Sequence, residues 1–222
     1  MIPINRQQID GIAKQTDSKQ RLGRTDYQLY PAYASSLTNL TDETKNFCTY
    51  EMAHWINNID RWLHNRHAEN IVSYKRGSIL FVDLGANNFR YEPSFTHPCI
   101  VLAQNKNFIL IVPCSSKKYG KNFPDVIDAT INDGFSCNTG IQIKHFQWVS
   151  KNRVISSMGA ASSRVLTLID QELLKLIPSY KLEVLQKNSL IEQLQSQLDT
   201  AHSQIRVLEE KLSEMNTSQN FE

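Results

Sequence analysis

The sequence predicts a mainly β protein with α-helical appendages, in which a small, strongly bent sheet or barrel is preceded by an amphipathic helix and followed by a coiled-coil helix. Short β-branched and apolar runs in the centre predict strands, apolar side chains at helical spacing predict the first helix, and a seven-residue apolar repeat predicts the coil. We therefore divide the chain into an irregular arm (1–40), a helix (41–73), a barrel domain (74–177) and a coiled-coil tail (178–222).

Composition and charge favour a cytoplasmic protein with an anionic ligand. No run approaches the roughly 18 apolar residues of a membrane span, and the first residues lack the apolar run of a signal peptide, so we expect no membrane contact. The net charge is +2, but residues 74–169 hold eleven basic against five acidic groups. Nucleic acid is the commonest ligand of such a domain, although a solvated, lysine-rich surface explains the surplus equally well. The four cysteines form no CxxC pair and are expected to be reduced.

The sequence of residues 1–73 predicts one amphipathic helix from its apolar spacing. Asn5 is a candidate cap for a short helix, and the polar chain that follows, rich in tyrosine around Pro31, suggests irregular structure up to residue 40. Thr41 is the expected cap of a helix that ends near Asn70, and its tryptophans are expected to pack on the barrel or across a dimer. No third ligand at suitable spacing accompanies His64 and His67 on this helix, so no metal site is expected. The residues at helical spacing are Met52, Trp55, Ile59, Trp62 and Leu63.

The centre of the chain predicts five or six short strands. Two of them enclose a long loop, Gly85 to Thr96, and a binding site is expected in a loop of this length held between strong strands. A helix is expected from about Leu166. The expected strands are 78–84, 98–103, 108–112, 126–131, 140–143 and 153–157.

Six motifs follow in order: RGSILFVDL, a loop with Tyr91 and Glu92, THPCIVL, IVPCSSK, TGIQIKHFQW and RVISSMG before a helix. This series, over about residues 75 to 177, resembles the MazF/PemK family of endoribonuclease toxins. The resemblance implies an SH3-like barrel with a C-terminal helix, usually a homodimer, that cuts single-stranded RNA with neither a metal nor another cofactor. It also implies a toxin–antitoxin system, in which an antitoxin partner occupies the RNA groove.

The resemblance assigns site residues position by position. The arginine of the family's Arg-Pro step falls on His97, its Pro-x-Thr threonine falls on Ser115, and its loop glutamate falls on Glu92. The Gln-hydrophobic-Lys step falls on Gln142 and Lys144. Cutting RNA by attack of the 2′-hydroxyl requires removal of one proton, delivery of another and stabilisation of negative charge on the phosphate. His97 is therefore expected to transfer the proton and Ser115 to donate to the phosphorane, with Glu92 assisting.

Basic and aromatic residues near these positions suit single-stranded RNA. Cations are expected to steer the backbone and aromatic rings to stack bases, although aromatic side chains in a long loop also serve to anchor it. Histidine is only partly charged near neutral pH, whereas arginine is always charged, so the alternative is a catalytically inactive module that binds nucleic acid or a protein partner. The residues expected to bind RNA are Arg90, Tyr91, Phe95, Ser116, Lys117, Lys118, Lys121, Gln142 and Lys144.

The tail carries four heptads. An apolar stripe of this period is too narrow to bury against its own domain and requires a second helix. We expect a homodimer through the coil and the barrel; the alternative is a helical partner such as an antitoxin. The stripe comprises Val184, Ile191, Leu198, Ile205 and Leu212, with Leu194, Ala201, Leu208 and Met215 three residues after the last four.

Overall fold

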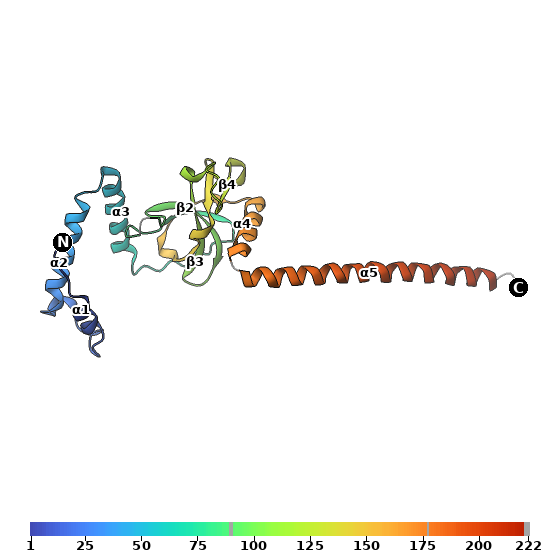
Figure 1. Cartoon of the computed structure of the whole chain (residues 1–222), viewed down its shortest axis with the longest axis horizontal. Helices are drawn as coiled ribbons and strands as arrows, with labels where there is room; N and C mark the ends of the chain where they lie inside the picture. Colours follow the sequence, from blue (N-terminus) through green and yellow to red (C-terminus); the bar gives the residue numbers. More distant parts are fainter. Residues whose placement is uncertain (89–90, 177, 220–222) are drawn as a thin grey trace.

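The computed structural model describes residues 1–88, 91–176 and 178–219 and shows three parts: an N-terminal helical arm, a central β-domain and a projecting C-terminal helix (Figure 1). Within these residues the β-domain holds seven antiparallel strands in the order β4-β5-β3-β2-β1-β7, with β6 paired to β3. The predicted fold class is confirmed. The strands are β1 Ser78–Asp83, β2 Thr96–Gln104, β3 Phe108–Ser115, β4 Val126–Ala129, β5 Thr139–Gln142, β6 Gln147–Ser150 and β7 Val154–Ala160.

The sequence missed β6, which is four residues long. Only Trp148 and Val149 in it are apolar, so it shows no period. It pairs with the first half of β3, Phe108 to Ile111, whereas β5 pairs with Cys114 and Ser115 at the other end. Because the two halves of β3 have different partners, the sheet bends around this strand.

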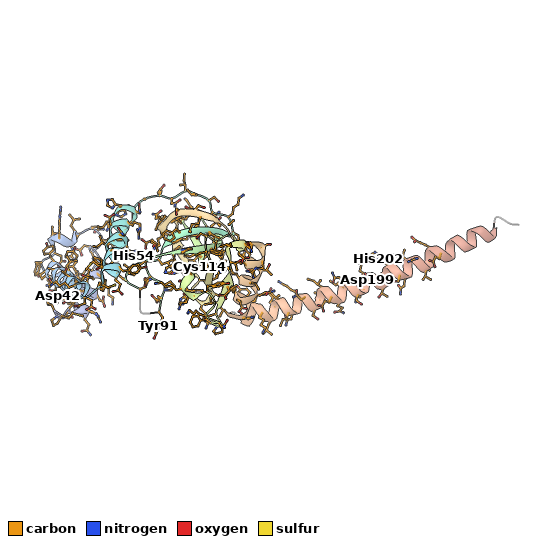
Figure 2. All side chains as sticks on the ribbon, turned by 90° about the horizontal axis from the view of Figure 1, so that it is seen from above. Asp42, His54, Tyr91, Cys114, Asp199 and His202 are labelled. Atoms are coloured by element: carbon orange, nitrogen blue, oxygen red, sulfur yellow. The ribbon has the colours of Figure 1, made fainter. Side chains whose placement is uncertain are left out.

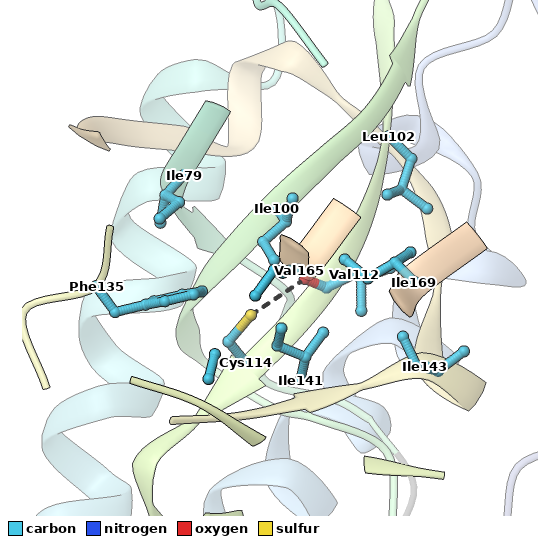
Figure 3. Close-up of a cluster of buried hydrophobic side chains, with 11 residues drawn as sticks. Ile79, Ile100, Leu102, Val112, Cys114, Phe135, Ile141, Ile143, Val165 and Ile169 are labelled. Atoms are coloured by element: carbon cyan, nitrogen blue, oxygen red, sulfur yellow. Dashed lines mark hydrogen bonds between the residues drawn. The ribbon is translucent and has the colours of Figure 1, made fainter. Parts of the chain in front are cut away.

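Both faces of the central strands are buried. Figure 3 shows one cluster, in which Ile79, Ile100 and Cys114 meet Val165 and Ile169 of helix α4 (Ser163–Leu176). The neighbouring residues on the strands fill a second cluster, which includes Leu80, Val101, Ile111 and Cys99. Burial raises the pKa of the Cys99 and Cys114 thiols well above the ordinary value, so both stay protonated.

The N-terminal arm forms α1 (Arg6–Ala13), α2 (Leu29–Thr44) and α3 (Thr49–Asn65). The short helix capped by Asn5 is present as α1, whereas most of α2 lies where irregular chain was expected. Pro31 lies in the first turn of α2, where proline is tolerated, and not in irregular chain. The Asp26 carboxylate accepts hydrogen bonds from the backbone N–H groups of Gln28 and Leu29 just before that turn.

The expected helix from Thr41 is therefore wrong in its boundaries. Thr41 lies near the end of α2, and a short non-helical segment separates α2 from α3. At the start of α3 the Glu51 carboxylate accepts a hydrogen bond from the backbone N–H of Cys48 at 3.2 Å. The helical spacing correctly predicts α3, but the cap was placed about two turns too early.

Two helices end the chain. Helix α4 packs on the side of the β-domain opposite α3, and α5 (Pro178–Gln219) projects away from it (Figure 1). The long helix of the tail is confirmed; its pairing into a coil stays a prediction. Within the described residues, no helix has the length and apolar content to cross a membrane.

Candidate functional site

His97, on β2, and Ser115, which ends β3, lie near each other at one end of the sheet. The register between β2 and β3 begins with Cys99 and Pro113; His97 lies two residues before Cys99, and Ser115 lies two residues after Pro113. Both side chains are half-buried. The sheet therefore brings together the two residues to which the resemblance gives the largest chemical roles.

A backbone carbonyl fixes the orientation of the His97 ring. Its Nδ1 lies 3.0 Å from the carbonyl oxygen of Cys114, the residue before Ser115. Because a carbonyl oxygen only accepts, Nδ1 carries the hydrogen in this contact. In the neutral ring Nε2 is then the nitrogen with an available lone pair. The ring can take up a proton at Nε2 and release it again from the same atom.

The loop between β1 and β2 returns to the sheet just before His97. The N–H of Leu84 donates to Phe95 O at 2.7 Å, and the N–H of Phe95 donates to Gly85 O at 2.6 Å. Glu92 is exposed in this loop, and so is Tyr91, which is 77% exposed (Figure 2). Arg90 lies outside the described residues. The loop is thus anchored at its base, and Phe95 is part of that anchor.

The lysines follow β3 on the other side of Ser115. Helix η2 (Ser116–Lys118) starts directly after it, with Ser116 and Lys117 exposed. The Lys117 Nζ lies 5.9 Å from the centre of the Tyr50 ring, and the Lys118 Nζ lies 5.0 Å from the centre of the Phe123 ring. Lys121 is exposed three residues further on. These cations border the His97–Ser115 end of the sheet.

Gln142 and Lys144 are placed less favourably for a strand of RNA. Gln142 closes β5 and is only 6% exposed, which leaves little of it for an external ligand. Lys144 is exposed, and its Nζ lies 3.9 Å from Asp125 Oδ1. The structure does not join these two side chains to the His97–Ser115 pair by any described contact.

Sequence reasoning missed the contribution of α3 to the site. The His54 ring lies 4.3 Å from the Tyr50 ring and 5.4 Å from the Phe95 ring, between α3 and the β-domain (Figure 2). With the Lys117 contact to Tyr50, the first half of α3 forms a wall beside the His97–Ser115 end. The apolar spacing of α3 predicted a helix, but it carried no information about where the helix docks.

A buried carboxylate attaches α3 to the sheet. Asp83, at the end of β1, accepts from Arg61 Nε at 2.6 Å, from the Gly85 N–H at 3.0 Å and from the Asn58 side-chain amide. Asp83 and Asn58 are both buried, at 6% and 7% exposure. Asp83 was visible in the sequence as an acidic residue ending an apolar strand, which is a signal for a buried polar contact.

Residues 75–177 match a family model described as the PemK-like, MazF-like toxin of type II toxin-antitoxin systems. The match covers slightly under half of the chain, and we call this part the PemK/MazF domain. The PemK/MazF domain thus spans the whole β-sheet and α4, whereas α1, α2, α3 and α5 lie outside the match. The contacts of Tyr50, His54 and Arg61 with this domain are consequently additions made by the N-terminal arm.

Several solved structures resemble the PemK/MazF domain. One is MazF (Form-I) from Deinococcus radiodurans, at 16% identity and a TM-score of 0.42, covering 48% of this chain and 98% of that chain. A second is an endoribonuclease in complex with its cognate antitoxin from Mycobacterial species, at 14% identity and 0.35, covering 46% and 90%. A third is the Mycobacterium tuberculosis toxin MazF-mt6, at 8% identity and 0.36, covering 44% and 93%. A comparison with curated proteins found no match.

Proposed function

We propose that the protein is an endoribonuclease that cuts single-stranded RNA at selected sequences without a metal ion. The observation that carries this proposal is the contact of the His97 ring with the carbonyl of Cys114, directly before Ser115, at the end of the sheet bordered by Lys117. A proton carrier, a hydroxyl donor and a cation are the groups that a 2′-hydroxyl attack on the neighbouring phosphate requires. The family of the central domain supports the same reaction class.

The carbonyl of Cys114 sets the direction of proton transfer. With the hydrogen held on Nδ1, the His97 Nε2 accepts the proton of the 2′-hydroxyl as its oxygen attacks phosphorus. The Ser115 hydroxyl donates to a phosphoryl oxygen as negative charge develops there. The departing 5′-oxygen takes a proton from solvent, and the protonated His97 ring then returns its proton to solvent from Nε2. The products are a 2′,3′-cyclic phosphate and a 5′-hydroxyl end.

Two parts of the chain contribute beyond the reaction centre. Tyr91 is exposed on the β1–β2 loop and can stack a base, which would make cutting depend on sequence. The apolar stripe of α5 is exposed in a single chain, as Ile191 (51%) and Leu198 (55%) show, and a parallel coil between two copies would bury it. An antitoxin partner is the regulator that the family description supports.

The test is cleavage of a long single-stranded RNA by the purified full-length protein in excess EDTA. We expect discrete cuts whose 5′-side fragments end in a cyclic phosphate. His97→Ala and Ser115→Ala should each lower the rate at least a hundredfold, because each removes a group that acts in the transition state. His202→Ala, on α5, and Ser157→Ala, on β7, are the matched controls and should leave the rate unchanged.

A second candidate function rests on one specific observation. His97 occupies the position where the family motif has a permanently charged arginine, which favours a binding module that has lost its chemistry. RNA that stays intact while binding the protein in a salt-sensitive manner would establish this module and overturn the nuclease.

A further inference from the structure

A cleft of about 700 Å³ lies between the second half of α3 and the β-domain. Its walls are the helix from residue 58 to residue 66, the start of the β1–β2 loop (83–88) and the segment from β6 to β7 (150–155). Six of the seventeen described lining residues come from outside the PemK/MazF domain. The cleft is therefore a feature that the N-terminal arm adds to the domain.

The cleft is positively charged. Arg61, Arg66 and Arg153 line it, and Asp83 is the one carboxylate among the described lining residues. Arg61 is paired with Asp83. Arg66 and Arg153 are exposed and have no carboxylate partner among the described residues of the lining. Two guanidinium groups thus face one open space, an arrangement that suits a phosphate.

An exposed aromatic ring stands beside these cations. Trp62 lines the same cleft, is 52% exposed and carries the Arg66 guanidinium 5.2 Å from its ring centre. The sequence placed Trp62 in a packed interface, and the structure leaves half of it open to solvent. A tryptophan next to arginines is the combination on which unpaired bases stack.

Hydrogen bonds across the cleft hold its walls together. The Asn152 side-chain amide donates to the carbonyl oxygens of Asn65 and Ala68 at the end of α3, at 3.2 and 2.5 Å. The Asn70 amide donates to Lys151 O at 2.8 Å. With the Arg61–Asp83 pair, these contacts fix the helix relative to the sheet, so that little ordering is left for a ligand to induce.

We propose that this cleft binds one nucleotide of the RNA strand outside the step that is cut, with its base on Trp62 and its phosphate between Arg66 and Arg153. The inference rests on the proposed function. Helix α3 connects the two places, because its first half contacts Phe95 and Lys117 beside the reaction centre. From His54 to Trp62 the helix rises about 12 Å. A strand that lies along α3 passes from one place to the other.

The test measures binding of a labelled single-stranded RNA by fluorescence anisotropy, with full-length His97→Ala as the parent so that the RNA stays intact. Adding Trp62→Ala should weaken binding roughly five- to a hundredfold, the range expected for loss of one stacked base. Trp62→Phe should restore most of the affinity. The double change Arg66→Ala/Arg153→Ala should weaken binding and reduce its salt dependence.

Matched controls separate this cleft from general effects. Trp148→Ala removes another tryptophan that is 52% exposed but lies outside the cleft, and Arg6→Ala/Arg24→Ala removes two charges from the N-terminal arm. Both should leave the affinity unchanged. Equal affinity of the parent and the cleft variants, or equal losses in the controls, would overturn the cleft and leave the proposed function standing. A parent that binds no RNA would overturn both.

Discussion

Asp133 joins the sheet to α4 through a single carboxylate. It is 4% exposed and accepts from Ser162 Oγ at 2.7 Å and from Arg164 at 2.6 and 3.0 Å. The Arg164 guanidinium holds the pKa of this carboxyl well below its usual range, with help from the Thr130 N–H and the Ser162 hydroxyl. The carboxylate therefore stays charged over almost the whole accessible pH range.

This pKa gives a pH dependence with a definite sign. A depressed folded pKa contributes stability above the unfolded value of about 3.9, and the contribution is lost as the pH falls through the folded value. At pH 7 we expect Asp133→Asn to lower the free energy of unfolding by about 2 kcal/mol, because it removes charged hydrogen bonds. Urea titrations should show that the difference in free energy of unfolding between variant and parent is the same at pH 5 as at pH 7 and becomes smaller below pH 4. A gap that grows in acid would contradict this.

Gly140 controls the position of the lysine segment. A Cβ on this residue would lie 2.8 Å from Lys118 Cβ, 2.9 Å from the Lys118 carbonyl carbon and 2.7 Å from Val126 Cγ1. Because one of these atoms is backbone, η2 must move to admit a methyl group. We expect Gly140→Ala to weaken RNA binding severalfold. A Cβ on Gly11 would have no heavy atom within 4 Å, so the control Gly11→Ala should leave RNA binding unchanged. Anisotropy titrations of both variants check this.

At the scale of elements, the docking of α3 depends on one buried carboxylate. Arg61→Ala leaves the buried Asp83 carboxylate with fewer hydrogen-bond donors, and we expect it to lower the free energy of unfolding by about 2–3 kcal/mol. Hydrogen exchange should then quicken in α3 while the strands β2 and β3 keep their protection. The control Lys45→Ala breaks the exposed ion pair with Asp42 on α2 and should change neither the stability nor the hydrogen exchange of α3. Uniform quickening throughout the sheet would contradict a local role.

The same elements show how much of the fold can be predicted from the sequence. Strands β1, β2 and β3 were predictable because both their faces are buried. A strand buried on both faces has a continuous run of apolar residues in the sequence, such as Ile79 to Val82. The starts of α2 and α3 were not predictable, because Asp26 and Glu51 set them through local hydrogen bonds that no periodic pattern shows. The motifs identified His97 and Ser115, which the structure brings close together. The roles of His54 and Arg61 depend on how α3 docks on the β-domain, and no local sequence pattern records that docking.

At the scale of the whole molecule, we expect the apolar stripe of α5 to join two copies of the chain. Leu198, in the apolar stripe, is 55% exposed, and Leu185, off the stripe, is 54% exposed. We expect Leu198→Asp to convert a dimer into a monomer, because it places a charge in the coil core, whereas Leu185→Asp should leave the dimer intact. Sedimentation equilibrium of both variants measures the mass directly. A parent that sediments as a monomer would contradict the coil.

The cleft beside α3 combines segments that lie far apart in the chain, around residues 62, 85 and 153. A ribosome makes them in that order, so α3 is synthesised long before the last wall exists. A nascent chain that ends before about residue 150 holds Trp62, Arg61 and Arg66 but lacks Arg153 and the last wall of the cleft. The cleft that we propose for RNA can therefore form only after the chain has been synthesised to about residue 155 and this segment has folded against α3.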